Sequence, residues 1–164
     1  MSLKRPLLLL GLVLSAPVVW ASSAQCGFIQ DPDRQAYCRA INAGGSVQCG
    51  FIKSRDLQAR CRAETDRNPA QCGFIQDRDA AADCRASVGG PKGETSPAQC
   101  GFIQDSDRRD YCRATNGDGS SQCGFIKDGD LQAMCRAETG GGSAQCGFIK
   151  SRDLQATCRA KARN

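Results

Sequence analysis

The sequence has no histidine, and only 5% of its 164 residues are aromatic. Histidine is the commonest general acid or base in enzymes, so its absence argues against the usual catalytic arrangements. The single tryptophan, Trp20, lies in the apolar N-terminal segment, which leaves Tyr37 and Tyr111 as the only polar aromatic residues after it. A sugar-binding site built on aromatic side chains is therefore disfavoured.

Basic clusters and closely spaced cysteines are missing as well. The formal net charge of +5 includes Lys4 and Arg5, and elsewhere acids and bases alternate, unlike the basic patches of nucleic-acid-binding proteins. The Cys-x2-Cys and Cys-x4-Cys pairs of zinc modules and redox catalysts do not occur. We therefore expect no nucleic acid, metal or cofactor to be bound, and no enzymatic activity.

Large apolar side chains are scarce after residue 21, where each repeated unit has one Phe, one Ile and in some cases one Leu. A unit this small cannot bury enough apolar surface on its own, and such units depend on disulfides, metals or neighbouring units. The chain has 12 cysteines, all within the repeats. We expect disulfides to supply the missing stability.

What the chain does contain is one segment repeated six times, opening with Gln-Cys-Gly-Phe-Ile and closing with Cys-Arg-Ala. The copies occupy 25–40, 48–63, 71–86, 99–114, 122–137 and 145–160. Such a short period indicates a solenoid or a string of small modules. The connectors are rich in Gly, Ser, Asn and Pro, and the longest, 87–98, separates repeats 1–3 (22–86) from repeats 4–6 (99–164) as a candidate flexible joint.

The cysteine spacing favours one pairing. The two cysteines of a copy are always 12 positions apart, whereas the spacing between copies changes where the longest connector intervenes, between Cys84 and Cys100. Spacing alone does not determine connectivity, but a constant separation beside a variable one favours bridges within copies. The predicted disulfides are Cys26–Cys38, Cys49–Cys61, Cys72–Cys84, Cys100–Cys112, Cys123–Cys135 and Cys146–Cys158.

The position five residues after each first cysteine predicts the start of a helix. It is always Asp or Ser, which cap a helix N-terminus through a side-chain oxygen, and in the first copy Pro32 follows, as suits the first helical turn. Two residues after the cap comes Asp33 or its equivalent, an anion favoured near the positive end of the helix dipole. We therefore expect a helix such as 32–40 in every copy. The predicted caps are Asp31, Ser54, Asp77, Asp105, Asp128 and Ser151.

A shorter helix is expected before each cap. Asn68-Pro69 and Ser96-Pro97 are typical helix starts, and the helices that they begin would end near Gln76 and Gln104. Each copy is then a pair of short antiparallel helices. The predicted fold is all-α, with six disulfide-stapled helical hairpins that are either stacked as a small solenoid or strung as beads.

Helical periodicity separates the residues of the first helix. Cys26 and Ile29 share a face toward the partner helix, whereas Phe28 lies about 200° from Cys26. We expect each Phe to pack on the adjacent copy; the alternative is an exposed ridge for binding. Gly27 and its equivalents are expected to permit close approach of the partner helix, or to bend the first helix. The phenylalanines are Phe28, Phe51, Phe74, Phe102, Phe125 and Phe148.

The Asp-x-Asp pair also suggests a calcium loop, but an EF-hand needs further oxygen ligands, a glycine and a glutamate at position twelve. Ser54 and Ser151 replace the first Asp in two copies. Helix capping accounts for that exchange, and calcium ligation does not.

Residues 1–21 are typical of a secretory signal peptide, with Lys4 and Arg5 before an apolar run and a cleavage site after Ala21. A retained membrane anchor is the alternative, but the run is shorter than the roughly 20 residues that a spanning helix needs. Lipid attachment at Cys26 is disfavoured because Gln25 precedes it. We expect a periplasmic or extracellular location, where paired cysteines persist.

The pattern Cys-x-x-Ile-x-Asp-x-Asp-x-x-x-x-Cys resembles the tandem repeats of uncharacterised exported bacterial proteins. The resemblance covers all six copies, which depart from it only at Ser54 and Ser151. It implies disulfide-closed units in a bacterial envelope or secreted setting, and no activity.

Three functions remain open. The first is a non-enzymatic repeat protein that presents several modules to a protein or envelope partner and gains avidity from their number. The second is a secreted effector, inhibitor or antimicrobial, or a precursor of small disulfide peptides. The third is a cysteine-based metal or redox buffer.

Overall fold

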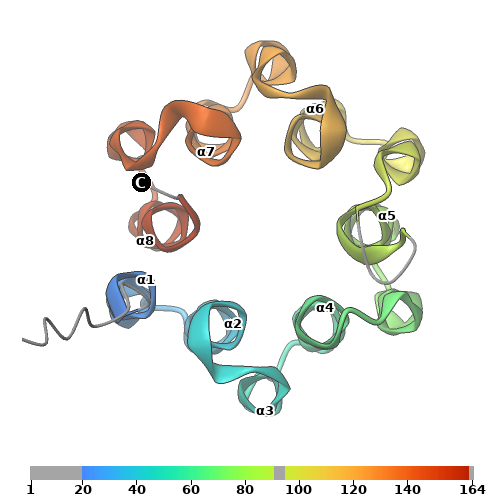
Figure 1. Ribbon diagram of the computed structural model, residues 1–164, viewed down its shortest axis with the longest axis vertical. Coiled ribbons are helices and arrows are strands. Elements are labelled where there is room, and N and C mark those ends of the chain that lie inside the picture. Colours follow the sequence, from blue (N-terminus) through green and yellow to red (C-terminus); the bar gives the residue numbers. More distant parts are fainter. Residues whose placement is uncertain (1–19, 91–94, 163–164) are drawn as a thin grey trace, which may run out of the picture.

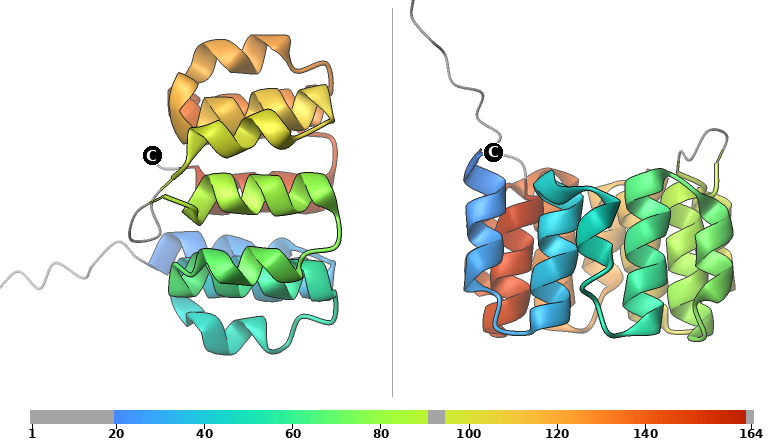
Figure 2. Two further views of the ribbon diagram at one scale, coloured as in Figure 1. Left: turned by 90° about the vertical axis from the view of Figure 1, so that its right-hand side faces the viewer. Right: turned by 90° about the horizontal axis from the view of Figure 1, so that it is seen from below.

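The six repeats form a closed ring of helical hairpins (Figure 1). The computed structural model describes residues 20–90 and 95–162, which contain helices and turns but no strand. The predicted signal peptide lies outside the described residues, except for Trp20 and Ala21. Each hairpin places one helix on the inside of the ring and one on the outside, with the helices running along the ring axis (Figures 1 and 2).

The inner helices begin where the sequence predicts. In every copy the cap side chain accepts a hydrogen bond from the backbone N–H three residues later, as between Asp31 and Arg34 at 2.8 Å. The inner helices are α2 (Pro32–Arg39), α4 (Arg55–Asp66), α5 (Arg78–Val88), α6 (Ser106–Arg113), α7 (Gly129–Arg136) and α8 (Arg152–Lys161). Three of them continue into a wider π-helical turn, namely η2 (Ala40–Gly44), η6 (Ala114–Asp118) and η8 (Ala137–Gly141).

The outer helices are shorter and mostly of the 3-10 type. They are α1 (Trp20–Gln25) with η1 (Cys26–Phe28), α3 (Ser46–Cys49), η3 (Pro69–Phe74), η5 (Pro97–Phe102), η7 (Ser120–Phe125) and η9 (Ser143–Phe148). Two of them were predicted to reach Gln76 and Gln104, but they end earlier, because Ile75 and Ile103 adopt extended conformations that begin the turn to the inner helix. Extended backbone at the isoleucine directs its side chain inward.

All six disulfides lie within copies, with the predicted partners. Their Cα–Cα distances are 5.6 to 5.7 Å, in the range of ordinary disulfides. No free cysteine remains. Each bridge joins an outer helix to the inner helix of the same hairpin.

Six small cores, one at each boundary between neighbouring hairpins, replace a single hydrophobic core. At the boundary of repeats 2 and 3, Ala59 and Ala63 of α4 pack on Cys72 and Ile75 of the next copy. The same arrangement recurs around the ring. Alanine at both inner-helix positions lets the next hairpin approach closely, except after repeat 4, where Asp110 takes the first position and Tyr111 packs beside Ala114. The hairpins therefore stack, and do not behave as separate beads.

The sixth core joins the two ends of the repeat array. Ala156 and Ala160 of α8 pack on Cys26, Ile29 and Cys38 of the first copy. An open solenoid would leave these surfaces exposed. The predicted stack is therefore closed on itself.

The hairpin turns lie on one side of the ring, and the connectors lie on the other together with the start of α1 and the end of α8 (Figure 2). Gly119 and Gly142 reverse the chain with φ of 77° and 65°, which glycine adopts readily. The boundary that follows the longest connector is built like the rest, with Ala82 and Ala86 on Ile103. Its role as a joint stays a prediction.

Candidate functional site

The constant aspartate of each inner helix bonds to the next repeat. The Asp33 carboxylate accepts hydrogen bonds from the backbone N–H groups of Lys53 and Ser54, at 3.0 and 2.8 Å. The sequence predicts only a favourable interaction with the dipole of its own helix. Five equivalent pairs of hydrogen bonds occur around the ring. Their acceptors and backbone donors are Asp56 with Gln76 and Asp77, Asp79 with Gln104 and Asp105, Asp107 with Lys127 and Asp128, Asp130 with Lys150 and Ser151, and Asp153 with Gln30 and Asp31.

These hydrogen bonds lower the pKa of all six aspartates. The largest cause is the pair of backbone N–H donors, which stabilise the ionised carboxylate. Each acceptor also holds the turn that carries the next helix cap. The aspartates therefore act as clamps between repeats.

Most residues that are identical in all six copies have a role in the fold. The cysteines form disulfides, the aspartates clamp the next repeat, and the constant Ile and Ala are buried in the boundary cores. Four constant positions remain, those of Gln25, Gly27, Phe28 and Arg39 in the first copy. The glutamine is half-buried in every repeat, whereas the other three positions are exposed in nearly every repeat.

The phenylalanines are exposed. Phe28, Phe51, Phe74, Phe102, Phe125 and Phe148 keep 65 to 73% of their surface accessible. The prediction that each packs on the adjacent copy is wrong, because the isoleucine next to it fills the boundary core. The alternative prediction of an outward ridge agrees with this exposure.

The glycine that precedes each phenylalanine has no packing role. A Cβ atom built at Gly27, Gly73, Gly101, Gly124 or Gly147 would meet no atom within 4 Å, and only Gly50 has a neighbour, the carbonyl oxygen of Val47 at 3.2 Å. The partner helix therefore does not require glycine by close approach, contrary to our expectation. None of the six has a positive φ either.

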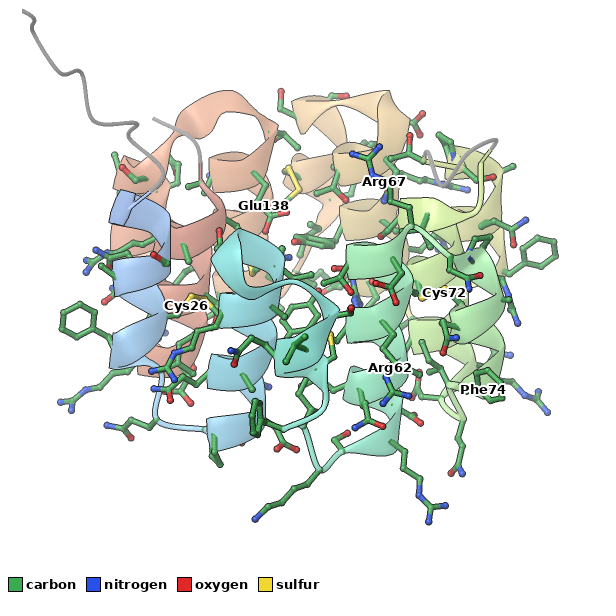
Figure 3. The ribbon with its side chains drawn as sticks, turned by 60° about the horizontal axis from the view of Figure 1, so that its bottom comes forward. Cys26, Arg62, Arg67, Cys72, Phe74 and Glu138 are labelled. Atoms are coloured by element: carbon green, nitrogen blue, oxygen red, sulfur yellow. A yellow bond between two sulfur atoms is a disulfide. The ribbon has the colours of Figure 1, made fainter. Side chains whose placement is uncertain are left out.

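The constant arginine follows the second cysteine. Arg39, Arg62, Arg85, Arg136 and Arg159 are exposed, and Arg113 is half-buried. None of them forms an ion pair with another described residue. Figure 3 shows Arg62 of one repeat and Phe74 of the next on the outside of the ring. We call the six constant glycines, phenylalanines and arginines the outer belt.

The ring interior is lined by a position that differs between copies, the residue before the second cysteine. It is Tyr37, Arg60, Asp83, Tyr111, Met134 and Thr157 in turn. Arg60 Nη1 lies 2.6 Å from Asp83 Oδ2, and Arg60 Nε lies 2.8 Å from Glu64 Oε1. Tyr37 donates its hydroxyl to Glu64 Oε2 at 2.5 Å.

The other half of the ring holds a matching group. Burial, and the negative charge of Glu138, raise the pKa of Tyr111, so Tyr111 lies near Glu138 as Tyr37 lies near Glu64 one half-ring away. Lys161 Nζ lies 3.6 Å from Glu138 Oε1, an oxygen that is buried without a hydrogen-bond partner. Figure 3 labels Glu138 in the interior. Each of these half-buried glutamates thus has a tyrosine and a cation nearby, Arg60 in one half and Lys161 in the other.

The charges of these groups shift one another's pKa values. Burial, and then Glu64, raises the pKa of Tyr37; Glu138, and then Tyr111, raises the pKa of Lys161, with Tyr37 and Glu64 contributing. Burial lowers the pKa of Arg60, but Asp83 and Glu64 outweigh it and keep that pKa well above its ordinary value. Each of the three carboxylates lies beside a cation, Arg60 or Lys161. Because losing either cation would leave a carboxylate uncompensated, we assign this network to the stability of the ring.

The sequence analysis missed this interior network. The residue before the second cysteine varies between copies while Cys-Arg-Ala does not. Other positions of the inner helix vary as well, so the sequence carries no specific signal for this one. Among residues 20–90 and 95–162 no cluster of three or more Cys, Asp or Glu side chains is arranged to hold a metal ion.

A comparison of the chain with protein-family models, with curated proteins and with solved structures finds no match. Six intrachain disulfides characterise it as an oxidised, cysteine-rich repeat protein and fit a compartment outside the reducing cytoplasm. Within the described ranges, the helices are too short or too polar to span a bilayer.

Proposed function

We propose that this chain is an exported, non-enzymatic repeat protein that presents six equivalent binding sites to a protein or envelope partner. The observation that carries the proposal is the outer belt, whose three constant residues have no role in the fold. Copies that have diverged at the interior position and in the connectors keep Gly, Phe and Arg unchanged. A shared external contact accounts for that pattern.

The export part of the proposal depends on the N-terminal segment and the disulfides. Residues 1–21 have the features of a secretory signal, and cleavage after Ala21 would release the ring to the periplasm or the exterior. The resemblance to exported bacterial repeat proteins supports the same setting.

Each repeat exposes a phenylalanine at the same position. Aromatic residues are enriched at protein–protein interfaces, so this constant exposure favours a role in binding. A ring holds its sites at fixed positions, so several of them can engage a multivalent partner without the entropic cost of ordering a flexible chain. Individual sites can then be weak while the whole ring binds tightly.

The test is a series of rings that differ in the number of intact sites. Phe is replaced by Ser in none, two, four or all six copies, and capture of envelope and extracellular proteins from the native source is quantified by mass spectrometry. We expect one set of partners to decline more steeply than in proportion to the sites removed, because avidity depends on their number.

A matched control carries Thr157→Ser in the interior. Partner capture that is identical for the ring with six Phe→Ser changes and the wild-type ring would overturn the proposed function. Far-UV circular dichroism and the mass of the non-reduced chain show whether each variant keeps its helices and six disulfides.

A further inference from the structure

We propose that each outer-belt site binds an acidic segment of a partner polypeptide. An apolar side chain of the partner packs on Phe beside the glycine backbone, and a partner carboxylate pairs with the constant arginine. This inference rests on the proposed function and adds the chemistry of the partner.

The glycine points to an occupant that approaches the backbone closely. Alanine would form a better helix than glycine at this position, and at Gly27, Gly73, Gly101, Gly124 and Gly147 the fold leaves room for its methyl group. The fold thus neither requires glycine nor benefits from it. A partner side chain that lies flat against the backbone next to Phe does require it, because a methyl group would hold that side chain away.

The charge of the outer belt selects an anionic occupant. The outer helices contain no acidic or basic residue, as η3 and η9 illustrate with the sequences PAQCGF and SAQCGF. Among the constant positions that are exposed on the outside, only the arginine carries a charge, and it has no ion-pair partner among the described residues. Guanidinium groups bind carboxylates through two parallel hydrogen bonds, which favours an acidic partner.

The directions of the six sites favour a polypeptide over a bilayer. The outer helices are distributed around the whole circumference (Figure 1), so separate segments can approach the sites from different directions. A bilayer that contacted all six would have to lie against the hairpin-turn side, where the six clamp carboxylates lie. Separate acidic segments, or the repeated segments of one long partner, can occupy all six. A second copy of this chain is disfavoured because its arginines would face these arginines.

The experiment selects ligands from a random peptide library displayed on phage, at low salt, against the immobilised mature ring. We expect the enriched peptides to combine one aromatic or aliphatic residue with two or more Asp or Glu residues. A selected peptide, synthesised with a fluorescent label, should bind with an affinity that falls as salt is added, since charge pairs at exposed sites are screened.

Three ring variants then separate the contributions. Replacing the six arginines by Gln should weaken peptide binding about tenfold per site, the loss expected for one charge-assisted contact. Gly→Ala at 27, 73, 101, 124 and 147 should weaken it similarly without lowering the thermal unfolding midpoint, because the fold leaves room for each methyl group. Six Phe→Ser changes should abolish it.

Each outcome decides between the two claims. If the selected peptides are not enriched in Asp or Glu but still require the ring's phenylalanines for binding, the inference of an acidic partner is wrong and the proposed function stands. Enrichment that is the same on the Phe→Ser ring would count against both. Binding of the ring to phosphatidylglycerol vesicles and to no peptide would show a membrane ligand. A concentration-dependent increase in mass would show self-association. Either result would contradict the inference.

Discussion

The carboxylate of Asp153 accepts a hydrogen bond from the backbone N–H of Asp31 at 3.0 Å, across 122 positions of sequence. Asp33 makes the same bond to Ser54 at a boundary where the chain is continuous. The last repeat therefore recognises the first with the contacts that any repeat uses for its successor. Closure of the ring needs no special surface.

The clamp at the closing boundary can be compared with a clamp inside the array. We expect Asp153→Ala to open the ring, because the sixth and first repeats have no connector to hold them together. Asp56→Ala removes the same bonds to Gln76 and Asp77, but the connector keeps those repeats adjacent. Small-angle X-ray scattering should show a larger radius of gyration for Asp153→Ala only. Equal radii for the two variants would contradict this expectation.

The six clamps predict loss of stability in acid. Hydrogen bonds from backbone N–H groups lower the pKa of each clamp carboxylate below its ordinary value of 3.8 in the folded state. Groups with a depressed folded pKa contribute stability above the unfolded pKa and lose it as pH falls through the folded pKa. The thermal midpoint should thus vary little between pH 5 and pH 7 and decrease below about pH 4. A ring with all six aspartates changed to Asn should show a weaker dependence.

The interior cation of the first half is expected to be important for stability. Arg60→Met leaves the carboxylates of Glu64 and Asp83 buried without their cation, and breaking a buried pair costs about 3 kcal/mol or more. The Arg60 side chain is 23% exposed, so we expect the loss in free energy of unfolding to be at the lower end of this range. Urea unfolding measures the loss.

Arg62→Met, two residues further along α4 on the outside, is the matched control and should change the free energy of unfolding by less than about 0.5 kcal/mol. Adding Glu64→Gln and Asp83→Ala to Arg60→Met should recover part of the lost stability. If the triple variant is less stable than Arg60→Met, the loss reflects packing and not unpaired charge.

The outer-belt glycine is expected to be dispensable for the fold. Gly101→Ala should leave the free energy of unfolding unchanged or raise it by up to about 1 kcal/mol, since the added methyl group meets no atom within 4 Å. Gly119→Ala should lower it by roughly 1 kcal/mol, because Gly119 has φ of 77°. Thermal and urea unfolding of the two single variants give the comparison. Destabilisation by Gly101→Ala would assign that glycine to the fold.

Each disulfide is expected to stabilise its own hairpin. Replacing Cys49 and Cys61 together by Ala removes a bridge between residues 12 positions apart, for which the chain-entropy model gives about 3 kcal/mol. The neighbouring boundary cores should keep the variant folded, with five bridges by non-reducing peptide mapping. A mapped bridge between different copies would contradict the hairpin arrangement.

The local structure could be predicted from the sequence because its determinants lie within one repeat. A constant spacing beside a variable one indicated the disulfides, and Asp31 or Ser54 before a helical segment indicated the caps. Helical periodicity predicted that Phe28 points outward and that Ile29 is buried toward the partner helix. Ile29 is buried, but it lies beyond the end of η1 in an extended conformation and packs on Ala156 and Ala160 of the neighbouring copy. Phe28 was nevertheless expected to find a neighbour, because the sequence does not show that Ile29 already fills the boundary.

The ring itself could not be predicted in this way. Closure depends on the small rotation between neighbouring repeats, summed over six boundaries, and no single residue encodes that sum. The donors for Asp33 belong to another repeat, so its clamp role was invisible, and only its helix-dipole role was inferred. The interior network of Arg60, Glu64 and Asp83 becomes apparent only when the inner helices are known to face one another.

Because the boundary of Ala156 and Ala160 with Cys26 and Ile29 repeats the other five, this array has no terminal unit of the kind that open repeat proteins must cap. Open solenoids lengthen by duplicating one unit, and they vary in size among relatives for that reason. A ring of five or seven units would need a different rotation at every boundary. Closure therefore fixes the number of repeats, and with it the number of outer-belt positions.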